Sequence, residues 1–139
     1  MRVNRRELFG VSVASATGAI LTKPCLATSA TSQDPIQLAV VGVRGTGQRH
    51  LQQLQGRRDV RIAALCDVDQ QMLGEARKVV QNFDGHAPAL VEDYRQLLDD
   101  PAIDALIIAT PNHWHGPLAT NAVQAEKDVY VESPCSHVF

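Results

Sequence analysis

Three glycines follow a short apolar segment and have the spacing of a phosphate-binding turn. The segment 38–41 reads Leu-Ala-Val-Val, which predicts a buried strand because it is short, apolar and bounded by glycine. It is followed by Gly42, Gly45 and Gly47, after which leucines recur at helical spacing. In a unit of strand, glycine turn and helix, the first N–H groups of the helix can bind a phosphate. Glycine is favoured there because it allows a positive φ and the close approach of a ligand.

Asp67 is the second residue whose position suggests binding chemistry. It follows the next apolar segment, 60–65, and lies about 20 to 25 residues after the glycines, where a ribose-binding acid is expected. Two plainer interpretations stay open. The glycines can form a purely structural turn, and Asp67 can be a surface acid or a helix cap.

The elements that must position these residues alternate along the chain. We expect strands at 38–41, 60–65, 87–91, 105–109 and 128–131. Helices are expected at 46–55, from Asp67 or Asp69 to the turn at 82–85, at 92–98 and at 115–125. Strands that alternate with helices predict an α/β fold with a doubly wound parallel sheet. Right-handed crossovers then give the strand order 3-2-1-4-5.

The composition suits one soluble domain with a hydrophobic core. Of the 139 residues, 45% are hydrophobic, and the formal net charge is -2. The sequence has neither a basic stripe nor a set of stacking aromatic residues, which argues against nucleic-acid binding. Its three cysteines, Cys25, Cys66 and Cys135, indicate neither a disulfide framework nor a metal site. Cys66 is interpreted as a small hydrophobic residue at a strand end.

Residues 1–30 have the features of a twin-arginine-type signal peptide. Asn-Arg-Arg-Glu-Leu-Phe at 4–9 precedes a weakly apolar run at 10–21 and small residues at 27–30. The run is too short and too polar to span a bilayer, so stable membrane insertion is not expected. We therefore expect export to the periplasm or another extracytoplasmic compartment, with 31–35 as a linker. A basic disordered extension is the alternative interpretation.

The remaining candidate side chains have weaker signals. His113 and His115 flank Trp114 with a spacing that places them on different faces of a helix, so no metal site is expected. Trp114 is interpreted equally well as a packing residue and as a substrate contact. His50 is expected on a helix surface. Cys135 is a conceivable reactive thiol, whereas Ser133 lacks the strained turn and paired base of a nucleophile.

Four separated blocks resemble one family. They read Val-Val-Gly-Val-Arg-Gly-Thr-Gly at 40–47, Cys-Asp-Val-Asp at 66–69, Ala-Thr-Pro-Asn-His-Trp-His at 109–115 and Asp-Val-Tyr-Val-Glu-Ser-Pro at 128–134. Residues 36–139 thereby resemble the N-terminal NAD-binding Rossmann domain of the Gfo/Idh/MocA oxidoreductases, which include glucose–fructose oxidoreductase and inositol dehydrogenases. The resemblance implies hydride transfer between a small-molecule sugar or polyol and a nicotinamide cofactor. It also implies that the Rossmann fold is incomplete in these 139 residues, with the second α/β domain absent.

The resemblance also implies roles for individual residues. The glycine loop, comprising Gly42, Arg44, Gly45, Thr46 and Gly47, would contact the cofactor pyrophosphate. Asp67 would bind the adenosine ribose and repel a 2′-phosphate, which favours NAD over NADP. The nicotinamide side of the cleft would be lined by Thr110, Pro111, Asn112 and His115, and Glu132 would reach the nicotinamide ribose.

The sequence departs from the family pattern at two positions. Arg44 stands at the second glycine of the loop, and Ser133 replaces the lysine of the family's Glu-Lys-Pro motif. Lys127 cannot replace that lysine, because it lies five positions before Glu132, at the other end of the predicted strand. No catalytic residue is therefore assigned. We expect this chain to bind the cofactor weakly and to catalyse no turnover by itself.

The parent protein is then interpreted as an NAD-dependent dehydrogenase. Its second domain would supply the substrate-binding residues and the interface of a homo-oligomer. The alternative is a non-catalytic dinucleotide-binding or interaction module, or an inactive fragment, which the serine at position 133 favours.

Overall fold

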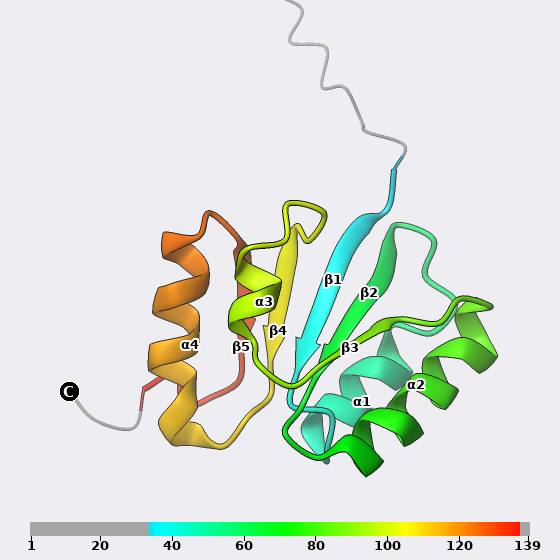
Figure 1. Ribbon diagram of the computed structural model, residues 1–139, viewed down its shortest axis with the longest axis horizontal. Coiled ribbons are helices and arrows are strands. Elements are labelled where there is room, and N and C mark those ends of the chain that lie inside the picture. The colour runs from blue at the N-terminus through cyan, green and yellow to red at the C-terminus, as the bar shows by residue number, and fades with distance from the viewer. Residues whose placement is uncertain (1–33, 137–139) are drawn as a thin grey trace, which may run out of the picture. The chain divides into compact units, whose positions relative to one another are not determined.

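Strands and helices alternate through residues 34–136, the part of the chain that the computed structural model describes (Figure 1). The order agrees with the alternation expected from the sequence. The elements are β1 (Ile36–Val41), α1 (Thr46–Gln53), β2 (Val60–Cys66), α2 (Gln70–Asp84), β3 (Ala89–Val91), α3 (Arg95–Leu98), β4 (Ala105–Ile108), α4 (Asn112–Gln124) and β5 (Asp128–Val131).

The strands form one parallel sheet in the order β3-β2-β1-β4-β5, which confirms the predicted fold class and strand order. The chain moves outward from β1 through β2 to β3 and then returns to the other side of β1. The order therefore reverses between β1 and β4. In open α/β sheets, ligands bind in the crevice outside the carboxyl ends of the strands at such a reversal.

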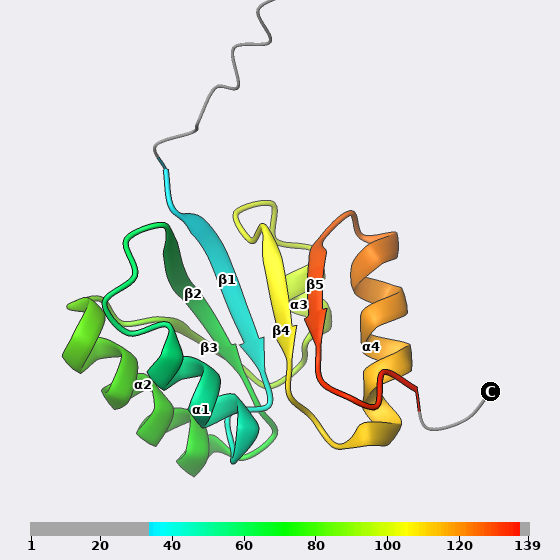
Figure 2. The same ribbon diagram turned by 180° about the vertical axis from the view of Figure 1, so that it is seen from behind.

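Helices cover both faces of the sheet. Helices α1 and α2 lie on one face, and α3 and α4 lie on the other (Figures 1 and 2). Along β1, Leu38 and Val40 pack with the α1 and α2 side chains, whereas Ala39 and Val41 pack with those of α3 and α4. Because successive side chains point to opposite faces, a strand with both faces buried must be apolar at every position.

Several helix boundaries differ from the sequence expectation: α1 ends at Gln53 rather than at 55, and α3 begins at Arg95 rather than at 92. Helix α2 continues through Asp84 and ends at Gly85, which adopts a left-handed conformation with φ 68°. Helix α4 begins at Asn112 rather than at residue 115. Pro111 has a ψ of 145° and so lies in an extended conformation directly before the first helical turn. The helix therefore begins at the residue directly after the proline.

Of the two candidate caps for α2, the structure selects Asp69. Its Oδ1 accepts hydrogen bonds from the backbone N–H groups of Gln71 at 3.0 Å and Met72 at 3.2 Å. A carboxylate at this position satisfies two of the N–H groups that a helix leaves without intrahelical partners. Asp67 is therefore left outside the helix, at the end of β2.

The end of α4 provides a test of backbone strain. Glu126 follows the helix with φ 60°, a conformation that favours glycine. Its N–H donates to the Val123 carbonyl, and the Lys127 N–H donates to the Ala122 carbonyl, as in a Schellman motif. We expect Glu126→Gly to raise the free energy of unfolding by about 0.5–1 kcal/mol, because glycine adopts this conformation without steric strain. Urea denaturation measures the change.

Gly85→Ala is the matched control for that substitution. Gly85 has a positive φ at the end of α2, and a Cβ there would meet no heavy atom within 4 Å. The substitution should lower the free energy of unfolding by about 1 kcal/mol, through backbone strain alone. Equal effects of the same sign in the two variants would contradict the conformational explanation.

The predicted signal segment, residues 1–30, lies outside the described residues. Within residues 34–136, no helix has the length and apolar character needed to cross a membrane.

Candidate functional site

The glycine loop between β1 and α1 packs directly against the end of β4. Gly42 has φ 86°, and a Cβ on it would lie 2.7 Å from the carbonyl oxygen of Ala109. A Cβ on Gly47 would lie 1.8 Å from the carbonyl oxygen of Gly42. Real Cβ atoms do not approach backbone oxygens so closely. Glycine is therefore required at both positions by the path of the loop itself.

The first turn of α1 is open to an anion. Gly45 is the N-cap residue, and no side chain caps the helix there. A Cβ on Gly45 would meet no heavy atom within 4 Å, so the loop is not crowded at this position. The Gly47 N–H donates to the Arg44 carbonyl oxygen at 2.9 Å. The other N–H groups of the first turn and the helix dipole together favour a bound phosphate. Thr46, the first residue of α1, lies at this end of the helix.

Arg44 bends away from this open end. Its guanidinium Nη2 donates to Asp69 Oδ2 at 2.8 Å, so the side chain spans from the glycine loop to the start of α2. Both side chains are substantially exposed, and the ion pair therefore contributes little to stability. It does set a direction for the arginine, which reaches toward α2.

Asp67 connects the end of β2 to the glycine loop. Its Oδ2 accepts a hydrogen bond from the Val43 N–H at 3.0 Å, and its Oδ1 accepts one from the Asp69 N–H at 3.0 Å. A carboxylate offers about four lone-pair positions, so two further hydrogen bonds can be accepted. Asp67 thus supports the loop and retains acceptor capacity toward a ligand.

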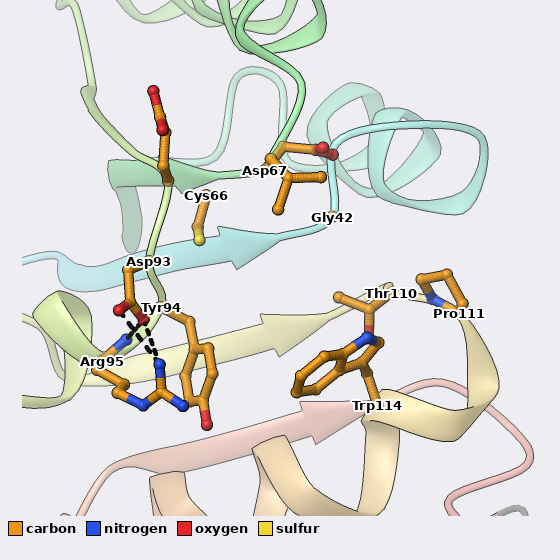
Figure 3. A pocket seen from close by; sticks show the side chains of 11 residues that line it. Gly42, Cys66, Asp67, Asp93, Tyr94, Arg95, Thr110, Pro111 and Trp114 are labelled. Atoms are coloured by element: carbon orange, nitrogen blue, oxygen red, sulfur yellow. Dashed lines mark hydrogen bonds and ion pairs between the residues drawn. The ribbon is translucent and has the colours of Figure 1, made fainter.

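A cavity of about 390 Å³ lies at the carboxyl ends of β1, β2 and β4, on the face of the sheet that carries α3 and α4 (Figure 3). The rings of Tyr94 and Trp114 lie on opposite sides of it. Its volume falls in the usual range for small-molecule sites. The lining residues are Gly42, Cys66, Asp67, Val68, Glu92, Asp93, Tyr94, Arg95, Thr110, Pro111 and Trp114.

Thr110 places a polar atom at this cavity that the protein does not satisfy. Its Oγ1 is buried and has no hydrogen-bond partner among the described residues. A buried hydroxyl without a partner destabilises a protein by about 1–3 kcal/mol. The atom is shielded from solvent, so a ligand could remove that cost only after the Thr110 side chain rotates toward the cavity. The unsatisfied hydroxyl, the two crowded glycines and the uncapped helix all fit a phosphorylated ligand such as a dinucleotide.

His115 lies behind the site rather than in it. Only 1% of the residue is exposed. Its Nδ1 lies 2.8 Å from the Pro134 carbonyl oxygen and its Nε2 lies 2.7 Å from that of Thr110. The ring therefore ties the turn after β4 to the segment after β5. In place of the expected cofactor-facing side chain, the structure has a buried one that positions Thr110.

His50 is not the surface residue that the sequence suggested. Its side chain is 14% exposed, and its Nε2 lies 2.5 Å from Glu132 Oε1. Glu132 follows β5, so this contact joins α1 to the end of the edge strand β5. No spacing in the sequence indicates the contact, because the two residues lie 82 positions apart.

The other candidates lie around the carboxyl end of β4 and β5. Asn112 and Ser133 are exposed, and Pro111 lines the cavity. Lys127 lies just before β5, where its Nζ donates to the carbonyl oxygens of Asp100 at 2.7 Å and Ile103 at 2.9 Å. It is thus committed to the opposite end of the strand from Ser133. No group of three histidine, cysteine or acidic side chains within residues 34–136 could hold a metal ion.

No pattern in the sequence indicated the cavity wall formed after β3. Tyr94 accepts a hydrogen bond on its Oη from Asn121 Nδ2 at 2.8 Å. The Arg95 guanidinium lies 5.3 Å from the centre of the Tyr94 ring. The pKa of the Asp93 carboxyl is below its usual value, chiefly because the carboxylate accepts a hydrogen bond from the Arg95 N–H. Asp93 therefore stays ionised, and its charge is paired with the Arg95 guanidinium, whose Nη1 donates to Asp93 Oδ2 at 3.2 Å.

Cys66 is buried at the end of β2 and lines the cavity. Burial raises the pKa of its thiol to about 12, and the neighbouring carboxylates of Asp67 and Asp93 add to the shift. Because the thiolate is the reactive species, we expect Cys66 to resist Ellman's reagent in the folded chain, even in mildly alkaline buffer. Reaction rates in a Cys25→Ser, Cys135→Ser variant measure this thiol alone.

The exposed Cys135 provides the control for thiol reactivity. A Cys25→Ser, Cys66→Ser variant should react rapidly when folded. The Cys66 thiol should react at a comparable rate only after denaturation. A folded protein in which both thiols react equally fast would contradict the burial of Cys66.

Comparisons with known proteins agree with this geometry. The model of the oxidoreductase family with an NAD-binding Rossmann fold, GFO_IDH_MocA, matches residues 36–138. The chain is 35% identical over 108 residues to the glycosyl hydrolase family 109 protein 2 of Shewanella sp. strain ANA-3, covering 73% of this chain and 23% of that protein. The chain therefore spans about a quarter of the length of this curated relative.

Two solved structures share the fold. The myo-inositol 2-dehydrogenase of Lactobacillus plantarum superposes with a TM-score of 0.66 at 25% identity, covering 76% of this chain and 30% of that one. The apo scyllo-inositol dehydrogenase of Lactobacillus casei gives a TM-score of 0.67 at 24% identity, covering 75% and 30%.

Proposed function

This chain belongs to the Gfo/Idh/MocA oxidoreductase family, and we propose that its residues 36–139 bind NAD for hydride transfer to or from a sugar or polyol. The observation that carries the proposal is the position of the site. An uncapped helix terminus, two glycines with no room for a Cβ and an unsatisfied threonine hydroxyl meet where the strand order reverses. That is where dinucleotides bind in this class of fold.

Each part of the cofactor has a candidate partner. Gly45, Thr46 and Gly47 would hold the pyrophosphate through the start of α1, with Gly42 giving room and Arg44 beside it. The adenosine ribose would donate its hydroxyls to Asp67. Thr110, Pro111 and Asn112 would border the nicotinamide half of the cofactor. His115 would act indirectly, by holding the backbone of Thr110, and Glu132 would reach the nicotinamide ribose.

The charges near Asp67 favour NAD over NADP in this proposal. Asp67, Asp69, Glu92 and Asp93 lie at or next to the cavity, and Asp93 has a lowered pKa. The cation on the glycine loop, Arg44, is held by Asp69. A 2′-phosphate would therefore meet carboxylates, while the two arginines at the site, Arg44 and Arg95, are already paired with Asp69 and Asp93.

The chemistry of hydride transfer belongs to the cofactor, whose nicotinamide ring accepts or donates the hydride when bound. The protein's part is to hold and orient it. A proton must also leave or reach the substrate hydroxyl, and Ser133 offers neither a charge nor a suitable acid or base at this position. The substrate-binding residues of the parent protein are proposed to lie outside these 139 residues.

A test of the oxidoreductase proposal is NADH formation with inositols and aldoses as substrates. The 139-residue chain is expected to give no turnover, whereas a longer parent protein that includes a second domain should reduce NAD. Turnover by the 139-residue chain would contradict the proposal that the substrate-binding residues lie outside it. Replacement of Ser133 by lysine in the longer protein should raise the rate.

The serine at position 133 also favours a second candidate function, a non-catalytic nucleotide-binding module. The same experiment separates the two. A longer protein that binds NAD but remains inactive on every polyol, before and after Ser133→Lys, would support the module.

We also propose that the protein is exported by the twin-arginine route, from the Arg5-Arg6 pair and the small residues at 27–30. The double variant Arg5→Lys, Arg6→Lys should then keep the protein in the cytoplasm. Full-length, unprocessed wild-type protein in the cytoplasmic fraction would contradict the proposal.

A further inference from the structure

His50 and Glu132 form an ion pair that spans the carboxyl edge of the sheet. His50 lies on α1, the helix that begins at the glycine loop, and Glu132 directly follows β5. Nε2 of the histidine lies 2.5 Å from Oε1 of the glutamate. An imidazole N–H can donate to a carboxylate, which in its ionised form only accepts. The contact therefore fixes one oxygen of Glu132 with respect to α1.

The histidine ring is itself held in place. It packs edge-on against the Tyr130 ring, with 5.3 Å between centroids and 75° between the ring planes. The His50 side chain is 14% exposed and that of Glu132 is 28% exposed, so the glutamate is the partner nearer to solvent. The Glu132 carboxylate is therefore more accessible to a ligand than the imidazole of His50.

The position of Glu132 matters for a dinucleotide. With the pyrophosphate at the start of α1, one nucleoside lies toward β2 and the other lies toward β4 and β5. Glu132 is the first residue after β5, on the second of these sides. A ribose there has hydroxyl donors, and the carboxylate has acceptor positions beyond the one that His50 uses.

We propose that His50 is a positioning residue that orients Glu132 to accept a hydrogen bond from the ribose farther from the adenine. The inference rests on the proposed function, because it requires a dinucleotide in the site. It goes beyond that function by assigning a role to a helix residue that lines neither the cavity nor the glycine loop.

Three ligands test this role on the full chain by isothermal titration. ADP has no second ribose, ADP-ribose has one, and NAD has one with nicotinamide attached. In a His50→Leu variant, affinity for ADP-ribose and NAD should fall about tenfold, as for loss of one charge-assisted hydrogen bond, whereas affinity for ADP should not change. Glutamine places an amide N–H near the position of Nε2. His50→Gln should therefore keep most of the affinity.

The ratio of NAD affinity to ADP affinity separates positioning from a merely structural role. Equal losses for all three ligands in His50→Leu, or no loss for any, would overturn the inference. If His50→Leu does not fold by circular dichroism, His50→Ala decides with the same expected pattern. Wild-type protein that binds ADP and ADP-ribose with equal affinity would overturn this inference but not the proposed function. Wild-type protein that binds none of the three ligands would contradict the proposed function as well.

Discussion

Gly47→Ala is expected to abolish NAD binding and to lower the free energy of unfolding by about 3 kcal/mol. The added Cβ would lie 1.8 Å from the Gly42 carbonyl oxygen and 2.9 Å from the Gly42 carbonyl carbon. These are backbone atoms, which cannot rotate away as a side chain would. The loop must therefore move. An ideal Cβ on Gly42 would itself lie only 2.7 Å from the Ala109 carbonyl oxygen, so the loop has no room to move toward the end of β4.

Gly74→Ala is the matched control for Gly47→Ala. Gly74 lies inside α2, and a Cβ there would meet no heavy atom within 4 Å. Alanine is favoured over glycine in a helix interior, so the variant should be more stable by about 0.5–1 kcal/mol and should bind NAD normally. Chemical denaturation and NAD titration of both variants give the comparison. A folded Gly47→Ala protein with wild-type affinity would refute the assignment of the loop as a phosphate cradle.

Asp67→Ala is expected to weaken NAD binding about 100-fold, as for the loss of two hydrogen bonds from ribose hydroxyls to a charged acceptor. NADP affinity should fall less, because the repulsion between the carboxylate and the 2′-phosphate is removed at the same time. The preference for NAD should therefore shrink. Part of the loss will come through the loop, since Asp67 also accepts the hydrogen bonds of the Val43 and Asp69 N–H groups.

Asp69→Ser is the matched control for Asp67→Ala, because it removes a neighbouring carboxylate that is not proposed to contact the ribose. A serine retains a capping oxygen for α2 but removes the carboxylate that binds Arg44. Stability and NAD affinity should stay close to those of the wild type, and NADP affinity should rise as the arginine is freed. Competitive titration with both cofactors gives the result. Asp67→Ala and Asp69→Ser with the same effect on NAD would argue that Asp67 acts only as a structural acid.

Most of the fold follows from local sequence signals. Residues 38–41 of β1, 62–66 of β2 and 105–108 of β4 are continuously apolar because both faces of the sheet are covered, and such runs can be recognised in the sequence. The strand order follows from the alternation with helices and from the handedness of crossovers. Boundaries were less predictable. The helix expected at 115–125 begins instead at Asn112, directly after Pro111.

The site was predictable only where its residues lie at strand ends. The glycines, Asp67, Thr110 and Glu132 each follow a strand, so a parallel sheet must bring them to one edge. The pairs Arg44–Asp69 and His50–Glu132 join residues far apart in the chain, and no periodicity encodes them. His115 shows the opposite case. Its place in a recognisable block suggested a cofactor contact, whereas its burial and two carbonyl neighbours hold the backbone behind Thr110.

The central claim is that this edge of the sheet binds a dinucleotide, and Trp114 provides a direct measurement. It is the single tryptophan of the chain and lines the cavity, so intrinsic fluorescence reports on the site alone (Figure 3). Titration of the folded chain with NAD should change the emission saturably, with a tighter apparent affinity than for NADP. A folded chain whose fluorescence does not respond to NAD, and which gives no heat of binding at the same concentrations, would contradict the claim.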